Sequence, residues 1–168
     1  MKYSYLLFDA DDTLFDFPRA SARAFSIMCS LHNIPDTPEV YQIYHQINLE
    51  LWAAFDRGEV SKEFVTLERY VRFLQAIGSD EDPVQCNDDY LSALGEGVYP
   101  LPHAEEVCRT LVERGHRLYI VTNAVASVQR SRLRGSVFAR LITDAPKTPG
   151  LPSRTQPITI MSAGACQE

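Results

Sequence analysis

The sequence predicts an α/β fold in which a helical segment interrupts a parallel sheet. Three observations lead to this prediction: residues 6–8 form a short apolar run that ends in aspartates, residues 17–97 have helical periodicity, and a second apolar run follows a helix at residues 118–121. The order strand, excursion, helix, strand is typical of parallel strands in an α/β layer. The helical segment is therefore expected to be an insertion after the first strand.

The first expected strand, residues 6–8, leads directly into Asp9 and Asp11. Residues two apart in an extended segment point to the same side, so both carboxylates can converge on one small volume. Two such charges are unfavourable together unless a cation neutralises them or one is protonated. Both remedies suit phosphoryl chemistry, with Mg²⁺ bridging a carboxylate and a phosphate. The first aspartate would attack phosphorus while the second handles the proton of the leaving group. An ordinary acidic turn is the alternative.

Four amphipathic helices are expected next, each bounded by a local start or stop signal. The signals are Asp16 with Pro18 and Asn33 for the first, Thr37-Pro38 and Gly58 for the second, Ser61 and Gly78 for the third, and Asp82-Pro83 for the fourth. Their expected apolar faces include Leu31, Ile43, Tyr44, Phe64 and Leu67. Four such helices in succession predict a small bundle that folds as one unit.

From residue 98 the pattern changes to an extended connector, a helix over about residues 103–114 and a strand over residues 118–121. This strand ends in Thr122 and Asn123. A hydroxyl and an amide at the carboxyl end of a strand can donate hydrogen bonds to a phosphate, together with N–H groups of the next helix. A Thr-Asn pair by itself is more often a turn, so its position after the strand carries the interpretation.

The segment Asp9-Ala10-Asp11-Asp12-Thr13 resembles motif I, D-x-D-x-T, of the haloacid dehalogenase (HAD) superfamily, and Thr122-Asn123 resembles its motif II. The resemblance implies a Rossmann-like HAD core, residues 1–16 and 98–144, with a helical cap domain, residues 17–97, inserted after the first strand. It also implies Mg²⁺-dependent hydrolysis of a phosphomonoester. Asp9 would form an aspartyl-phosphate, Asp11 would transfer protons, both would serve the metal, and Thr122 and Asn123 would bind the phosphoryl oxygens.

Two stretches, residues 8–15 and 122–133, are similar to the pyrimidine 5′-nucleotidases of this superfamily. The resemblance spans roughly residues 1–143 and makes a nucleoside 5′-monophosphate the expected substrate. Other HAD activities, sugar-phosphate hydrolysis or dehalogenation, remain alternatives because specificity lies in the cap. The alternative outside the class of enzymes is a catalytically impaired remnant that binds a ligand or partner without turnover.

The composition changes at Asp144, and residues 145–168 are rich in proline and small polar residues. The family uses a lysine that holds the phosphate and a later strand that ends in aspartates, and no such strand follows in this segment. Lys147 is a candidate for that lysine, with a solvated tail lysine as the alternative. We expect residues 145–168 to be a disordered non-family tail, produced by a shifted reading frame or an early end. Activity should then be impaired, and residues 4–8 should form an unpaired apolar edge.

The formal net charge of −6 over 168 residues argues against a nucleic-acid or membrane-surface partner. The expected partner is a small-molecule phosphomonoester, and the expected location is the cytoplasm. The four cysteines, at positions 29, 86, 108 and 166, have no metal-ligand spacing and are expected to be reduced thiols.

Several further residues allow two interpretations each. The basic run Arg130, Arg132 and Arg134 is interpreted as a solvated helix face rather than a nucleotide-phosphate contact. The four histidines are expected at the surface or at helix caps. The aromatic residues Tyr44, Trp52 and Phe55 are expected to pack in a core rather than to line a base-binding pocket, and Gly95-Glu96-Gly97 is expected to be a hinge.

Overall fold

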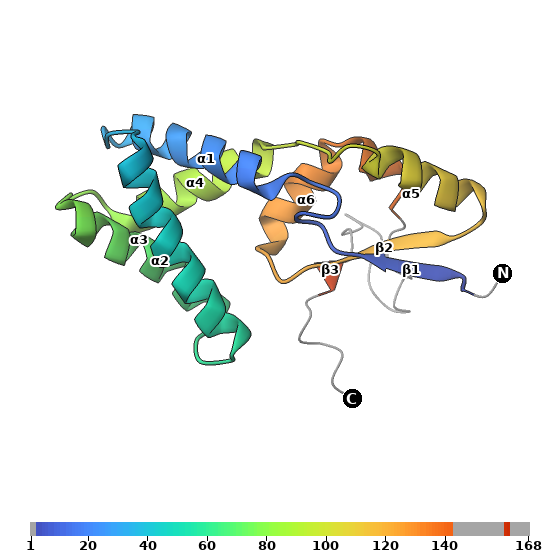
Figure 1. The fold of residues 1–168 in the computed structure, drawn as a ribbon, viewed down its shortest axis with the longest axis horizontal. Coiled ribbons are helices and arrows are strands. Elements are labelled where there is room, and N and C mark those ends of the chain that lie inside the picture. Colours follow the sequence, from blue (N-terminus) through green and yellow to red (C-terminus); the bar gives the residue numbers. More distant parts are fainter. Residues whose placement is uncertain (1–2, 143–159, 162–168) are drawn as a thin grey trace, which may run out of the picture. The chain divides into compact units, whose positions relative to one another are not determined.

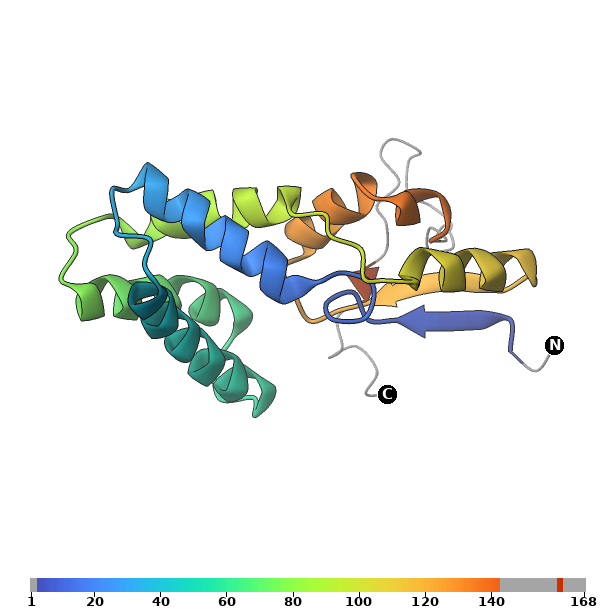
Figure 2. The same cartoon turned by 45° about the horizontal axis from the view of Figure 1, so that its top comes forward.

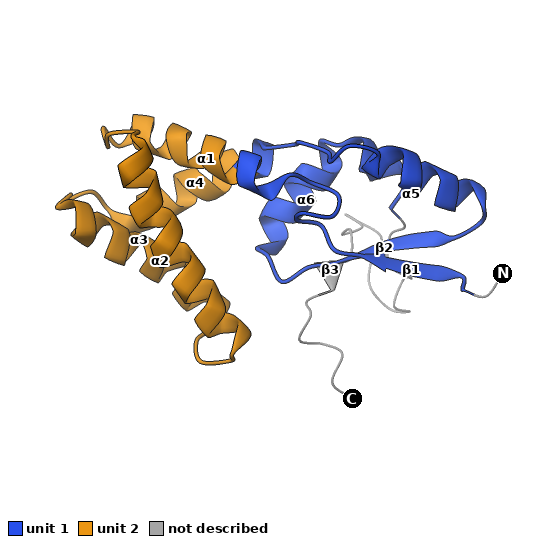
Figure 3. Cartoon of the chain, viewed as in Figure 1, with its two compact units in different colours: residues 1–20, 95–168 blue, residues 21–94 orange. Residues whose placement is uncertain are grey.

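The computed structural model describes residues 3–142 and 160–161. The chain separates into two compact units, one of residues 1–20 with 95–168 and one of residues 21–94 (Figure 3). It passes between them inside α1 (Phe17–Leu31) and α4 (Pro83–Glu96). The division thus falls within the expected cap range, residues 17–97, rather than at its ends.

The sheet of the first unit consists of parallel strands, as expected. Its described strands are β1 (Tyr5–Phe8), β2 (Arg117–Val121) and β3 (Ile160–Met161), in the order β1-β2-β3. Phe8 pairs with Ile120, and Val121 pairs with Met161, so all three strands run toward the same edge. The α/β class is confirmed. Within the described residues β1 lies at the edge of the sheet.

The short strand β3 lies in the segment 145–168, which we expected to be largely disordered, with residues 157–161 as a candidate strand. Ile160 and Met161 pair with β2 and extend the sheet, so these two residues are not part of a disordered tail. Neighbouring residues of β2 offer free ladder positions, which an apolar dipeptide can occupy. Lys147 and the other residues of the tail lie outside the described part of the chain.

One face of the sheet is covered by α5 (Ala104–Glu113), α6 (Ala126–Arg134) and the 3₁₀ helix η1 (Val137–Arg140) (Figures 1 and 2). The core beneath them is formed by buried residues of β2, α5, α6, η1 and the turn after β1: Ala10, Leu14, Phe15, Ala104, Cys108, Leu118, Ile120, Leu133 and Phe138. On the opposite face of β1, Tyr5 and Leu7 are about 60% exposed (59% and 61%). The side chains of β1 therefore alternate between the core and an open face.

In the second unit, the predicted helix boundaries are confirmed where a local capping signal exists. Thr37 caps α2 (Pro38–Asp56), and Ser61 caps α3 (Lys62–Ile77), each through a bond from a backbone N–H three residues later. Gly78 ends α3 in the left-handed region, with φ 68°.

The predicted apolar faces of these helices were wrong at several positions. The exposed positions are Leu31 (60%), Ile43 (37%), Phe64 (43%) and Leu67 (40%). When the apolar stripe of a helix is wider than the surface that packs against it, the residues at the edges of the stripe stay exposed. Isolated apolar residues on a protein surface are common.

The core of the second unit is a cluster of aromatic rings on four helices. Tyr44 is 1% exposed, and its ring centroid lies 4.8 Å from that of Phe25, 5.6 Å from that of Tyr70 and 5.7 Å from that of Tyr90. Tyr44 therefore packs in a core, as expected, instead of lining a base-binding pocket. The same packing buries Arg69, which is 4% exposed.

His32 corrects the expectation that all histidines lie at the surface or at caps. It is 8% exposed, with Nδ1 2.9 Å from Glu81 Oε2 and Nε2 2.9 Å from Asp89 Oδ2. Burial alone lowers the pKa of this imidazole, but the two hydrogen-bonded carboxylates outweigh burial and raise the pKa above its usual value. A doubly protonated ring can donate to both carboxylates, so His32 links α4 and the loop before it to the end of α1.

Candidate active site

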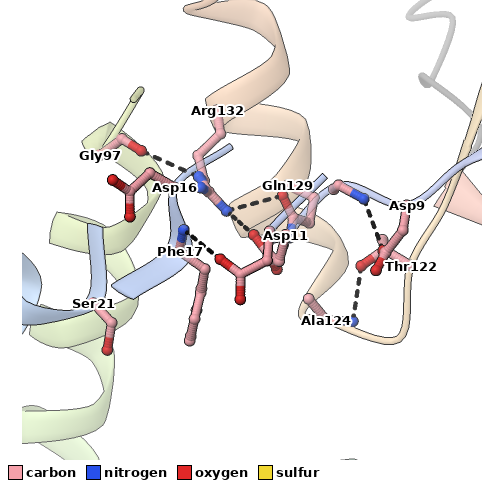
Figure 4. A network of polar contacts seen from close by, with 12 residues as sticks. Asp9, Asp11, Asp16, Phe17, Ser21, Gly97, Thr122, Ala124, Gln129 and Arg132 are labelled. Atoms are coloured by element: carbon pink, nitrogen blue, oxygen red, sulfur yellow. Dashed lines mark hydrogen bonds and ion pairs between the residues drawn. The ribbon is translucent and has the colours of Figure 1, made fainter. Parts of the chain in front are cut away.

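The carboxyl ends of β1 and β2 bring together three residues that the sequence singled out. Asp9 follows Phe8, Thr122 follows Val121, and the pairing of Phe8 with Ile120 places both ends at one edge of the sheet. A cavity of about 370 Å³ opens there, lined by Leu7, Phe8, Asp9, Val121, Thr122 and Asn123. Figure 4 shows Asp9 and Thr122 at this edge.

The polar groups in the cavity differ in exposure. Asp9 and Asn123 are exposed, and Asp9 Oδ1 accepts a hydrogen bond of 2.7 Å from the backbone N–H of Ala10. Thr122 is 3% exposed, and its Oγ1 accepts a hydrogen bond of 3.2 Å from the Ala124 N–H. A hydroxyl that accepts one hydrogen bond can still donate its own proton, so Thr122 can serve as a donor to a ligand.

A tight turn after β1 fixes the direction of the second aspartate. The carbonyl of Ala10 accepts hydrogen bonds of 3.0 Å from the N–H groups of both Leu14 and Phe15. Asp12 adopts a left-handed backbone with φ 55°, which aspartate tolerates better than most residues, and its N–H donates to the Phe15 carbonyl at 2.8 Å. The turn directs the Asp11 side chain toward α6 (Figure 4).

Asp11 is held by two side chains of α6. Its Oδ1 accepts a hydrogen bond from Nη1 of Arg132, and its Oδ2 accepts one of 2.6 Å from Nε2 of Gln129. Burial raises the pKa of the Asp11 carboxyl above its ordinary value, while the Arg132 guanidinium and the Gln129 amide oppose this rise. Asp11 lies beside the cavity and is not among its lining residues.

The structure therefore corrects the interpretation of the basic run as a solvated helix face. Arg132 is fully buried, whereas Arg134 in the same run is exposed. Gln129 is also buried, and sequence reasoning missed it. A signal existed for their burial: both polar residues share a helical stripe with Val128 and Leu133.

No group of three or more His, Cys, Asp or Glu side chains among residues 3–142 and 160–161 could hold a metal ion. Among the residues that line the cavity, side-chain oxygens are provided by Asp9, Thr122 and Asn123. The helices of the same residues include none with the length and apolar character of a membrane span.

Comparison with known proteins places this geometry in a family. The family model of haloacid dehalogenase-like hydrolases matches residues 6–141. The HAD hydrolase YfnB of Bacillus subtilis is 36% identical over 135 residues. The pyrimidine 5′-nucleotidases PynA of Streptococcus pneumoniae and YjjG of Escherichia coli are 29% identical over 136 residues and 28% identical over 134 residues.

The matches cover 80%, 81% and 79% of this chain, which spans 57% of the length of each of these relatives. The crystal structure of YfnB bound to magnesium superposes with a TM-score of 0.77 and 34% identity, over 83% of this chain and 62% of YfnB. Sequence and fold agree over the same region. The chain belongs to the haloacid dehalogenase-like hydrolases.

Proposed function

We propose that this chain carries the active site of a Mg²⁺-dependent hydrolase of small phosphomonoesters, with nucleoside 5′-monophosphates as the favoured substrates. The observation that carries the proposal is the shared cavity of Asp9 and Thr122 at the ends of two paired parallel strands. Two of the relatives are pyrimidine 5′-nucleotidases, which supports the substrate class.

In the proposed first step, an oxygen of Asp9 attacks phosphorus, and the ester bond between phosphorus and the leaving oxygen breaks. The leaving alkoxide takes a proton from Asp11, which gives the free alcohol and an aspartyl-phosphate. Attacking and leaving oxygens lie roughly in line across phosphorus. A proton donor beside the cavity, such as Asp11, therefore suits a leaving group that lies on the far side of the phosphoryl group from Asp9.

In the second step, the Asp11 carboxylate takes a proton from a water molecule, whose oxygen attacks the same phosphorus. The bond to Asp9 breaks, so that inorganic phosphate leaves with both residues restored. Thr122 and Asn123 would donate hydrogen bonds to the equatorial phosphoryl oxygens, where negative charge accumulates.

The described residues fit part of a magnesium site. Mg²⁺ is bound in proteins by one or two carboxylates, with waters and substrate phosphates completing its octahedron. The Asp9 carboxylate, whose Oδ1 accepts a hydrogen bond from the backbone N–H of Ala10, would be one ligand. The backbone carbonyl of Asp11 would be a second. A bound ion would neutralise charge between the phosphate and the Asp9 carboxylate.

Phosphate release from nucleoside 5′-monophosphates, sugar phosphates and 4-nitrophenyl phosphate, with and without EDTA, tests the proposal. We expect Mg²⁺-dependent release that Asp9→Asn lowers by at least about 10³-fold, because the covalent step is lost. Asp12→Asn is the matched control, since Asp12 lies in the same turn and is exposed, and its side-chain Oδ1 accepts a hydrogen bond from the backbone N–H of Phe17, which an amide oxygen can also accept. Wild-type release no faster than that of Asp9→Asn would favour the non-catalytic remnant.

A further inference from the structure

Arg132 is an unusual residue in the first unit because its charged group is fully enclosed. It is 0% exposed, and its only acidic partner among the described residues is Asp11. Its Nε donates to the Gly97 carbonyl at 3.1 Å, and its guanidinium carbon lies 4.6 Å from the centroid of the Phe15 ring. The guanidinium is thus fixed by contacts that are independent of Asp11.

Gln129 extends the same arrangement from one turn earlier on α6. Its Oε1 accepts a hydrogen bond of 3.3 Å from Arg132 Nη1, and its Nε2 donates to Asp11. The amide is therefore oriented by Arg132 and cannot reverse without losing both bonds. Figure 4 shows the three side chains meeting between the acidic turn and α6.

Both oxygens of Asp11 are consequently occupied by donors from a single buried helix face. Rotation of the carboxylate would break at least one charge-assisted hydrogen bond, which contributes substantially to its orientation. Asp9, two residues earlier, has no comparable support from a side chain of the described residues. Among the two aspartates, side-chain hydrogen bonds from α6 thus orient Asp11, to which we assign proton transfer.

We propose that Arg132 and Gln129 are positioning residues that hold the Asp11 carboxyl in the orientation needed to protonate the leaving group. The inference rests on the proposed function and deepens it. Arg132 and Gln129 would not contact the substrate, because each acts through Asp11. An ion pair that merely stabilised the fold would give different kinetics, because it would affect all substrates alike.

The identity of the leaving group separates the two roles. An alkoxide leaving from a nucleoside 5′-monophosphate is strongly basic and needs a proton, whereas 4-nitrophenolate leaves readily without one. General-acid catalysis contributes typically about 10²–10⁴-fold. A misplaced Asp11 should therefore slow formation of the aspartyl-phosphate from the nucleotide far more than from the nitrophenyl ester.

The kinetic experiment compares Arg132→Lys and Gln129→Met with Arg134→Gln, an exposed arginine of the same helix. We expect kcat/KM for the nucleotide, which reports the steps up to the aspartyl-phosphate, to fall by about 10–10²-fold in the first two variants. The value of kcat/KM for the nitrophenyl ester should be nearly unchanged, because hydrolysis of the shared intermediate does not enter this ratio. Gln129→Met keeps the charge of the buried pair, so it provides a test should Arg132→Lys not fold. Equal losses on both esters, or none on either, would overturn the inference.

A spectroscopic experiment tests the hydrogen bond between Gln129 and Asp11 in the absence of substrate. By NMR, the side-chain amide protons of Gln129 should exchange with solvent at least about tenfold more slowly than those of exposed Gln75, and Asp11→Ala should reduce this difference. An exchange rate of the Gln129 amide protons that is unchanged by Asp11→Ala would refute the proposed contact between these two side chains. If wild-type protein hydrolyses neither ester faster than Asp9→Asn, the proposed function fails and the inference fails with it. If it hydrolyses both and the variants show no discrimination, only the inference fails.

Discussion

Arg69 is a buried cation whose replacement tests how the second unit is held together. No carboxylate of the described residues pairs with it. Its Nη1 donates to Asn48 Oδ1 at 3.2 Å and its Nη2 to Asn87 Oδ1 at 3.1 Å. The guanidinium carbon lies 5.1 Å from the ring centroid of Tyr70 and 4.7 Å from that of Tyr90. Neutral amides and aromatic faces thus replace a counter-ion.

The effect of Arg69→Met follows from opposing contributions. Two hydrogen bonds from a charged donor and two cation–π contacts stabilise the folded state by about 4 kcal/mol, taking each at its lower bound. Methionine avoids the desolvation of a buried cation, which offsets about half of that loss. The buried Nε of Arg69, which has no hydrogen-bond partner in the described residues, disappears as well. We expect the variant to be less stable by about 2 kcal/mol.

Urea unfolding followed by the fluorescence of Trp52, the single tryptophan, reports on this unit. With a slope of about 2 kcal/mol per molar urea, the midpoint should fall by about 1 M. Arg72→Met is the matched control: Arg72 is 47% exposed on the same helix and pairs with Glu68, so it should cost less than about 0.5 kcal/mol. An Arg69→Met midpoint equal to or above that of the wild type would refute the reasoning, because desolvation would then outweigh the contacts.

Three further predictions concern a backbone position, a titration and the cavity. Gly78→Ala should destabilise the second unit by about 1 kcal/mol in urea unfolding, because φ is 68° although a Cβ would meet nothing within 4 Å; Gly78→Asn should cost less, and equal costs would contradict this explanation. The pKa of His32 is raised in the folded state. Its contribution to the free energy of unfolding is therefore fully present below the unfolded-state pKa of about 6.5, and it is lost as the pH rises through the folded-state pKa. The Trp52 unfolding midpoint should decline over that window in the wild type, and the decline should be smaller in His32→Gln; identical profiles would exclude the mechanism. Thr122→Val should raise KM for phosphate esters by about tenfold through the loss of one hydroxyl donor, whereas Thr122→Ser should not, and an unchanged KM in the valine variant would remove Thr122 from the phosphate site.

The helix boundaries could be predicted from the sequence because their causes are local. Thr37 and Ser61 cap the backbone three residues away, and Gly78 supplies a left-handed conformation at the last turn. The exposure of Leu31 and Phe64 could not be predicted in the same way. Periodicity identifies an apolar stripe, whereas the width that becomes buried depends on which helix packs against it.

The same distinction applies to the site. Asp9 and Thr122 each follow an apolar strand, so a parallel sheet necessarily brings their positions to one edge. The contact between Asp11 and Arg132 joins residues 121 positions apart, and nothing local identifies it. An arginine in a run of three is usually solvated, and its burial becomes favourable only because the fold supplies a carboxylate, a carbonyl and an aromatic ring.

The different surroundings of Asp9 and Asp11 support the different roles we propose for them. A nucleophile needs an oxygen that faces the substrate, and Asp9 lies in the cavity lining with a backbone hydrogen bond at Oδ1. A proton carrier needs a fixed direction, and Asp11 is tied to α6 at both oxygens. Exchanging the roles would require Asp11 to give up its hydrogen bonds from Arg132 and Gln129 before each attack, whereas a protonated Asp11 can still accept both of them. That cost makes the assignment of Asp9 as nucleophile and Asp11 as acid the physically favoured one.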